Sequence, residues 1–230
     1  VTKVVCFFGQ NPCAEPVPDE AAPAFLDWNL YLGPGRHRAY NPLIHPCNFR
    51  YFRDFSGGAI TDWGVHLLDI AQWALNKDHT SPKHIEAEGG YYPGNFYDVP
   101  RWMRVRYDYG DAILEWHQGT DTVIEPGQRY GTKFYGSEGE IFVNRSGYWA
   151  RRKDGRPLDE RLEENETRLH HAGDHYEDFF HAMRTRKPPT CDAETGHRAT
   201  TLAHLGNTAL HAERPLSYDP VRECFPDDPF

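Results

Sequence analysis

The chain has 230 residues, a length that suits one large domain or two small ones. Its formal net charge of −9 argues against nucleic-acid binding as the main activity, and its basic residues are scattered among acids. No apolar run approaches the roughly 18 residues of a membrane span, and no signal peptide is recognisable. We therefore expect neither a nucleic-acid nor a membrane partner. The compartment stays open between cytoplasm and periplasm, because any export signal would lie upstream of Val1.

The first half of the chain predicts helices and long loops after one strand. Its segments are, in chain order, a strand at Val1–Phe8, a proline-rich loop at Asn11–Pro23, a short helix at Ala24–Leu32, an aromatic and basic loop at Arg36–Asp54, and a long helix at Gly57–Asn76. In the short helix we expect Phe25, Trp28 and Leu32 to face inward. Long loops such as the one before the second helix are often functional.

The second half predicts strands followed by helices. Its segments are strands at His84–Gly90, Val99–Tyr109, Ala112–Gln118, Lys133–Tyr135, Gly139–Asn144 and Gly147–Arg152, a charged loop at Asp154–Glu166, helices at Asp174–Arg186 and Glu194–Glu213, and a tail at Pro215–Phe230. This order is typical of an α+β fold, with an open antiparallel sheet and helices packed on one face. His197, His204 and His211 recur every seven residues, a spacing typical of helix packing.

The cysteines give no framework for the fold. There are five, widely spaced and without a Cys-x-x-Cys pair. A cysteine-built zinc site and a disulfide framework are therefore not expected, and free thiols are the default expectation.

One helical face carries the most informative side chains. Asp62, His66, Asp69 and Trp73 recur at steps of four, three and four after the pair Gly57-Gly58. At 3.6 residues per turn these steps keep all four on one side of the helix. A carboxylate and an imidazole one turn apart can act as an acid–base pair, and a histidine oriented by a carboxylate suits deprotonation of an alcohol. The alternative is a solvated helix face.

Other side chains are candidates for shaping a pocket around this face. Asp69 lies on the helix itself, and the remaining substrate-binding candidates lie in the loop before it or at a later helix start: Arg53, His45, His175, Tyr40 and Asn48. His175 follows His170 and His171 and a candidate N-cap at Asp174. Our first expectation is that the chain has no metal site. The alternative is a zinc or manganese ion held by Asp62, His66 and a further acid or histidine.

Several motifs in one order make the chain resemble a known family. They are Phe52-Arg53-Asp54-Phe55-Ser56-Gly57-Gly58, Asp62-Trp63-Gly64-x-His66, Asp69-Ile70-Ala71-Gln72-Trp73, Leu26-Asp27-Trp28, Leu32-Gly33-Pro34, Gly136-x-Glu138-Gly139, Gly196-His197-Arg198, Asn207 and Asp219-Pro220. Together they resemble the C-terminal domain of the Gfo/Idh/MocA oxidoreductases, in their bacterial branch. The resemblance covers nearly the whole chain.

The resemblance implies a substrate-binding and oligomerisation domain built on an open antiparallel sheet. In the family, the acid and histidine corresponding to Asp62 and His66 help to deprotonate a sugar or inositol hydroxyl. The family's NAD(P) site and catalytic lysine lie in an N-terminal Rossmann domain, whereas this sequence contains no Gly-x-Gly-x-x-Gly and no repeated βαβ unit. We therefore expect residues 1–230 to form a single α+β domain without that N-terminal domain and without a bound cofactor of its own.

The sequence thus predicts the substrate half of a sugar or cyclitol oxidoreductase. His66 and Asp62 are the expected catalytic residues, NAD(P) is implied by the family, and pairing through the sheet face is expected to give a homo-oligomer. Two alternatives stay open at this point. One is a stand-alone carbohydrate-active hydrolase or isomerase, with or without a metal, and the other is a non-catalytic sugar-binding module.

Overall fold

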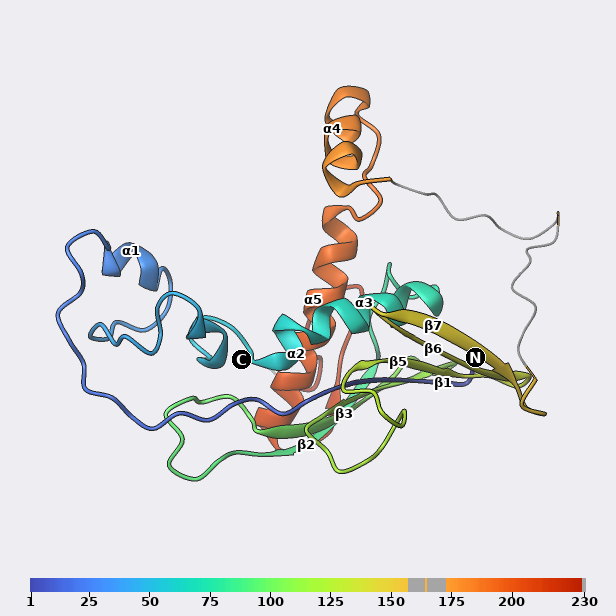
Figure 1. The fold of residues 1–230 in the computed structure, drawn as a ribbon, viewed down its shortest axis with the longest axis horizontal. Coiled ribbons are helices and arrows are strands. Elements are labelled where there is room, and N and C mark those ends of the chain that lie inside the picture. The colour runs from blue at the N-terminus through green and yellow to red at the C-terminus, as the bar shows by residue number, and fades with distance from the viewer. Residues whose placement is uncertain (157–163, 165–172, 229–230) are drawn as a thin grey trace.

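The computed structural model describes residues 1–156, 164 and 173–228. Its centre is one sheet in the order β7-β6-β5-β1-β4-β3-β2-β8, with the helices gathered on one side (Figure 1). The strands are β1 (Lys3–Phe8), β2 (His84–Gly90), β3 (Trp102–Asp108), β4 (Ile113–Gln118), β5 (Gly131–Tyr135), β6 (Gly139–Asn144), β7 (Gly147–Arg152) and β8 (Leu216–Ser217). The expected α+β architecture is confirmed.

The sheet is mixed rather than wholly antiparallel. β1 lies between β4 and β5, pairing parallel with β4 and antiparallel with β5. In this register Cys6 lies beside Trp116 on one side and Thr132 on the other. The consecutive strands from β2 to β4 and from β5 to β7 pair antiparallel with one another, so the sequence order alone does not show that β1 is inserted between these two groups.

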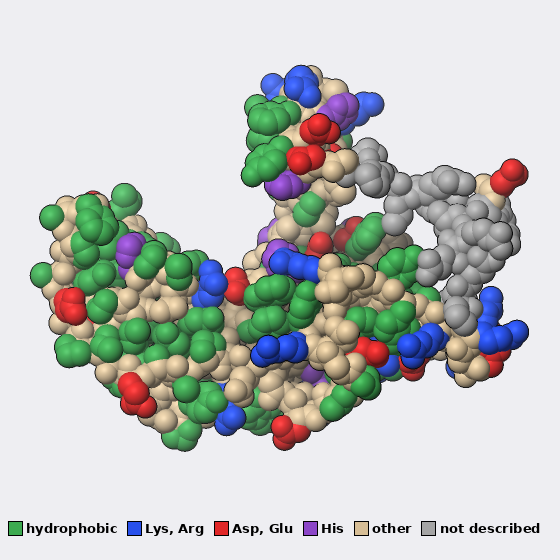
Figure 2. All heavy atoms as spheres, viewed as in Figure 1, with side chains coloured by type: hydrophobic (Ala, Val, Ile, Leu, Met, Phe, Trp, Pro, Cys, Tyr) green, Lys and Arg blue, Asp and Glu red, His purple; other side chains and the backbone are tan. Residues whose placement is uncertain are grey.

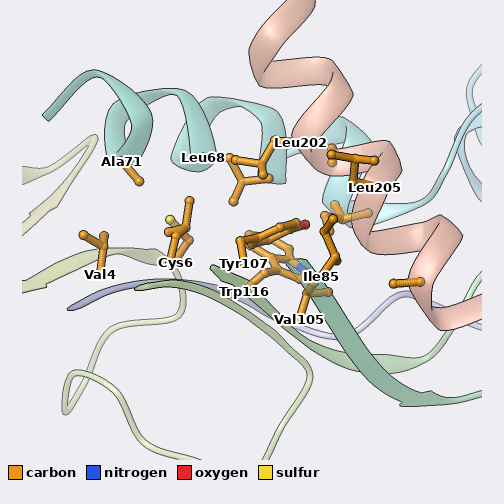
Figure 3. Packing of buried hydrophobic residues seen from close by; sticks show 14 of the residues in the cluster. Val4, Cys6, Leu68, Ala71, Ile85, Val105, Tyr107, Trp116, Leu202 and Leu205 are labelled. Carbon is orange, nitrogen blue, oxygen red and sulfur yellow. The ribbon is translucent and has the colours of Figure 1, made fainter. Parts of the chain in front are cut away.

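The alternating pattern of β3 places its apolar side chains under the helices. Met103, Val105 and Tyr107 are buried, whereas Arg104 and Arg106 point to the other face and are partly exposed. Figure 3 shows the buried side chains of the sheet meeting leucines of the helices above it. Trp116 and Tyr107 are among the largest side chains that are fully buried, so the aromatic residues form much of the core.

The long helix expected over Gly57–Asn76 is divided. α2 (Ala59–Asp62) and α3 (Gly64–Ala74) are separated by Trp63. Trp63 keeps helical dihedral angles, φ −83° and ψ −34°, so the chain continues in nearly the same direction. Asp62 therefore closes α2, and His66 lies in the first turn of α3.

An N-terminal lobe precedes the helix pair. It contains α1 (Trp28–Leu32), the 3₁₀ helix η1 (Asn48–Tyr51) and a second, smaller aromatic core around Ile44, Phe52 and Tyr97. The prediction that Phe25 faces inward is wrong, because its side chain is 84% exposed and lies ahead of α1. Leu32 is buried as predicted.

Two helices complete the described fold. α5 (Ala193–Ala212) packs on α3 and β2, whereas α4 (His175–Thr185) stands away from the sheet (Figure 1). The histidines spaced by seven on α5 are exposed rather than packed. His170, His171 and most of the expected loop at Asp154–Glu166 lie outside the described residues.

The structure gives direct observations on two expectations from the sequence, the free cysteines and the lack of a membrane-spanning helix. The five cysteines are all unpaired, and Cys6 alone among them is buried. Within the described ranges, no helix has the combined length and apolar character that crossing a bilayer requires.

Candidate functional site

The start of α2 is fixed by contacts from two distant elements. Gly58 has a φ of +76°, in the region that favours glycine, and the side-chain oxygen of Asn11 accepts a hydrogen bond of 2.9 Å from the first amide of α2. The Asn207 side chain on α5 donates to the Gly57 carbonyl at 3.0 Å. A Cβ on Gly57 would collide with that Asn207 side chain. The glycine pair therefore allows the close approach that positions Asp62.

Asp62 is paired with an arginine from the preceding loop. Its carboxylate lies 3.6 Å from the Arg50 guanidinium, and both side chains are about one third exposed. Arg50 belongs to η1 and also lies over the Phe49 ring at 5.7 Å. Among the described residues no hydrogen bond joins Asp62 to His66. Asp62 is therefore placed to bind a ligand hydroxyl together with Arg50 rather than to orient the imidazole.

His66 is exposed beside an aromatic wall. Its ring lies 6.5 Å from that of Trp63, in an edge-on arrangement. Trp63 stacks on Phe8 at 5.2 Å and contacts Tyr130 at the same distance, and the Arg145 guanidinium lies 4.4 Å from its centroid. These contacts fix Trp63 as a rigid flank to the imidazole.

The pKa of Asp69 is affected by His66, which lies on the same helix. Burial raises the pKa of Asp69, and the nearby Asp78 raises it further, while His66 lowers it. Asp69 and His66 are three residues apart on α3, so they share a helix face. On the predicted helix face, the structure thus pairs Asp62 with Arg50 and leaves His66 and Asp69 as neighbours one turn apart.

The remaining sequence candidates are dispersed. His45 and Tyr40 pack in the N-terminal lobe, where the Tyr31 ring meets His45 at 5.2 Å and Trp28 meets Tyr40 at 5.2 Å. Asn48 opens η1, next to the arginine that pairs with Asp62. His175 begins α4 and contacts its neighbour Tyr176, and within the described ranges no contact brings it to the other candidates.

Arg53 lines a separate hollow beside α5. The hollow has a volume of about 240 Å³ and is lined by Arg53, Ser56, Gly57, Tyr91, Val99, Pro100, His204, Asn207, Thr208, Leu210 and His211, a set that includes neither Asp62 nor His66. The side chain of His204 is exposed, but partial desolvation by its surroundings lowers its pKa. Sequence reasoning missed His204 and His211 as lining residues, although their spacing did mark one helix face.

The described residues form neither a cluster of metal ligands nor a dinucleotide-binding site. No group of three or more His, Cys, Asp or Glu side chains converges as a metal site within the described ranges. The parallel pair β1 and β4 is joined through helices, β2 and β3 rather than through one crossover helix. With no glycine fingerprint in the sequence, this chain's own residues do not fit a dinucleotide cradle.

The matching motifs on α2 and α3 raise the question of family membership. A sequence profile described as the oxidoreductase family, C-terminal alpha/beta domain (GFO_IDH_MocA_C2), matches residues 9–230. The chain belongs to the Gfo/Idh/MocA oxidoreductase family. The matched part corresponds to the C-terminal domain of that family, which confirms the resemblance seen in the sequence. No curated protein sequence matches the chain significantly.

Solved structures share the fold at low identity. An NAD-binding protein from Listeria innocua is 16% identical with a TM-score of 0.54, and the match covers 94% of this chain and 54% of that one. The WlbA dehydrogenase of Bordetella pertussis, in complex with NADH and UDP-GlcNAcA, is 12% identical with a TM-score of 0.55, covering 95% and 55%. An Agrobacterium radiobacter oxidoreductase, in complex with NAD⁺, L-tartaric acid and magnesium, is 10% identical with a TM-score of 0.55, covering 94% and 56%. The chain thus spans just over half the length of these proteins.

Proposed function

We propose that this chain is the substrate-binding and catalytic half of a sugar or cyclitol oxidoreductase that converts a hydroxyl to a ketone. The observation that carries the proposal is the placement of Asp62 and His66 one turn apart at the junction of α2 and α3, in a domain of this oxidoreductase family. Arg50 and Trp63 supply the polar and aromatic flanks of that junction.

The chemistry assigned to the chain is recognition and proton transfer. In the oxidation of a secondary alcohol, the His66 imidazole would accept the O–H proton, and a nicotinamide held outside this fold would supply the acceptor for the C–H hydride. The Asp62 carboxylate accepts a hydrogen bond from a neighbouring substrate hydroxyl, and Arg50 holds that carboxylate in place. Trp63, whose ring faces contact Phe8 and Arg145, offers the edge of its ring to the C–H groups of a sugar.

A sugar or polyol is favoured as the substrate class for two reasons. The exposed junction combines a carboxylate, a guanidinium and an aromatic ring, which match the hydroxyl groups and the apolar faces of a carbohydrate. The similar WlbA structure contains the nucleotide sugar UDP-GlcNAcA. An Asp62–Arg50 pair would also hold a tartrate-like hydroxy acid, so hydroxy acids belong in the substrate panel.

The test uses the full reading frame that carries this chain, or the chain with its co-expressed NAD(P)-binding region. Reduction of NAD(P)⁺ is measured with a panel of sugars, cyclitols and sugar acids. We expect His66→Ala to lower kcat/KM by roughly 10² to 10⁴ and Asp62→Asn to act mainly on KM. The control is His79→Gln, because His79 is an exposed histidine in the segment between α3 and β2, away from Asp62 in the chain and outside the sheet.

Two results would contradict the proposal. One is full turnover by His66→Ala. The other is product formation without a nicotinamide that is lost to a chelator, which is the behaviour of a metal-dependent hydrolase or isomerase. Stabilisation by a sugar with no turnover under any condition would favour the non-catalytic binding module instead.

We also propose that the open sheet face pairs two copies of the chain. That face carries rows of charges, with Arg104 bonded to Glu88 at 3.3 Å and Lys3 paired with Glu115 at 2.7 Å. Alternating charges of this kind can match a second copy across a two-fold axis. Arg106→Glu on the same face is expected to shift the assembly toward monomer in sedimentation equilibrium, and an unchanged mass would contradict the pairing.

A further inference from the structure

One exposed arginine lies against the aromatic residue beside His66. Arg145 is one of the two residues in the turn between β6 and β7, and its guanidinium lies 4.4 Å from the centroid of the Trp63 ring. The ends of β6 and β7 that this turn joins lie beside α3 (Figure 1). A segment far from α2 and α3 along the chain therefore brings a positive charge to the proposed site.

The turn that carries Arg145 is held in a defined conformation. The side-chain oxygen of Asn144 accepts a hydrogen bond of 2.8 Å from the Ser146 amide, and its nitrogen donates to the Gln128 side chain at 2.8 Å. The guanidinium gains a further attraction from the face of the Trp63 ring. Because backbone and side chain are both fixed, a ligand that binds this guanidinium has little left to order.

Among the described residues, no carboxylate is paired with the Arg145 guanidinium. The side chain is exposed, and the contact that holds it is the one with the Trp63 ring. Arg50, by contrast, is already paired with Asp62 at 3.6 Å. A guanidinium has five N–H donors and no acceptor, and its planar fork matches a carboxylate or a phosphate. The Arg145 side chain is therefore free to bind an anion.

The position of Arg145 suits a substituent of the substrate rather than its reacting hydroxyl. The Arg145 guanidinium and the His66 imidazole lie 4.4 and 6.5 Å from the same Trp63 ring, so one monosaccharide with a charged substituent can reach both groups. Asp62 is paired with Arg50 and not with Arg145. The two flanks of the junction can therefore bind different groups of one ligand.

The surrounding charges make this cation decisive for an anionic ligand. The chain has a formal net charge of −9, and Asp62 and Asp69 lie on α2 and α3 themselves. On the face seen in Figure 2, basic, acidic and hydrophobic side chains are interspersed over the region of these helices rather than gathered by sign. An anionic substituent is therefore repelled by the two acids unless Arg145 binds it, whereas a neutral sugar needs no such cation.

We propose that Arg145 determines substrate specificity by binding an anionic substituent, a carboxylate or a phosphate, of the sugar whose hydroxyl lies at His66. The inference rests on the proposed function and narrows its substrate class to charged sugars. The guanidinium donates two parallel hydrogen bonds to the anion, while Asp62 binds a hydroxyl at the other flank. Trp63 holds the guanidinium in place, and no proton or hydride passes through Arg145.

The experiment measures the preference for charged over neutral sugars in the full reading frame that carries this chain. D-Glucuronate, a glucose monophosphate and D-glucose are compared by calorimetric binding without nicotinamide and by kcat/KM with NAD(P)⁺. We expect Arg145→Gln to lower the preference for a charged sugar by roughly tenfold to a hundredfold, through Kd and KM rather than kcat. Arg145→Lys keeps the charge without the fork and should retain part of the preference. Loss of packing on Trp63 alone would weaken all three sugars alike and leave the preference unchanged.

Arg151→Gln is the matched control. Arg151 is an exposed residue of β7 in the same hairpin, and its guanidinium also lies 4.4 Å from a tryptophan centroid, that of Trp149. Trp149 packs on Phe142 in the sheet rather than beside His66. Both variants remove one positive charge, so a difference between them reports the local contact at Arg145 and not the general field of the protein.

The outcomes distinguish this inference from the proposed function. Three results overturn the role of Arg145 even if neutral sugars are oxidised: equal affinity of the parent protein for charged and neutral sugars, a preference that survives Arg145→Gln, or an equal loss in Arg151→Gln. Tighter binding of a charged sugar that depends on Arg145 supports the inference. If that sugar is bound but never oxidised, the proposed function fails and the binding role of Arg145 stands.

Discussion

Tyr107 and Gly206 form a contact whose energy can be tested directly. Tyr107 on β3 is fully buried, and its hydroxyl has no hydrogen-bond partner among the described residues. Figure 3 shows its ring pointing from the sheet toward α5. A Cβ at Gly206 on α5 would fall well inside van der Waals contact of that hydroxyl and would meet Ile60 and Val105 methyl carbons at 3.1 Å. Gly206→Ala therefore tests whether the hydroxyl sets the spacing between α5 and the sheet.

The expected free energies follow from three contributions. Alanine in a helix interior is favoured over glycine by about 1 kcal/mol. Overpacking against a fixed neighbour costs up to about 3 kcal/mol, so Gly206→Ala should lose roughly 2 kcal/mol of unfolding free energy. Tyr107→Phe removes an unpartnered buried hydroxyl and should gain about 1 kcal/mol. In the Tyr107→Phe background, Gly206→Ala should be close to neutral, because the obstructing oxygen is gone.

A double-mutant cycle measures this coupling. Urea unfolding of the parent, both single variants and the double variant gives four free energies, and we expect a coupling of about 2 kcal/mol. If Gly206→Ala costs the same in both backgrounds to within about 0.5 kcal/mol, the hydroxyl is not the obstacle. A loss of stability in Tyr107→Phe would show that this hydroxyl has a favourable partner in solution, such as water.

Three further outcomes test other parts of the structure. Asn11→Ala should lower the unfolding free energy by roughly 2 to 4 kcal/mol, because Asn11 makes buried hydrogen bonds to the amide of Ala59 and to a carbonyl near β3; a change below about 1 kcal/mol in urea unfolding would contradict this. The hydrogen bond from His117 holds the pKa of Glu115 at about 2, below its usual 4.5. Since the folded-state pKa is lowered, this carboxylate stabilises the fold above pH 4.5, and up to about 3 kcal/mol is lost as the pH falls toward 2. Urea unfolding from pH 5 to 2 should show a shallower acid limb for Glu115→Gln, and an unchanged limb would refute the assignment. Burial raises the pKa of Cys6 to about 12, so a thiol reagent should modify the other four cysteines in the native protein and Cys6 only after unfolding. Reaction of all five at one rate would show that β1 opens readily.

Local periodicity made the strands predictable. The alternation of charged and apolar residues in Trp102–Asp108 appears in the structure as alternating exposure, and the expected strands Gly139–Asn144 and Gly147–Arg152 match β6 and β7 at both ends. These features depend only on neighbours along the chain. The insertion of β1 between β4 and β5 depends on pairing across more than 100 residues, which no local pattern records.

The helical spacing of the candidate side chains could be predicted from the sequence, but their contacts in space could not. The spacing of Asp62, His66 and Asp69 on one helix face follows from helical geometry and was readable from the sequence. The partner of Asp62 is Arg50, and that contact depends on how η1 lies against α2. His175 starts a helix as its capping residue Asp174 indicated, yet the position of α4 in space is a tertiary property that the capping pattern does not contain.

The central place of β1 has a consequence for how the protein is made. Lys3 pairs with Ile113 on one side and with Tyr135 on the other, so the middle of the sheet closes only after the segment up to Tyr135 has been synthesised. Until then the apolar first strand has no neighbour, a condition that favours slow folding and self-association. Without β1 the sheet would separate into a three-stranded and a four-stranded piece.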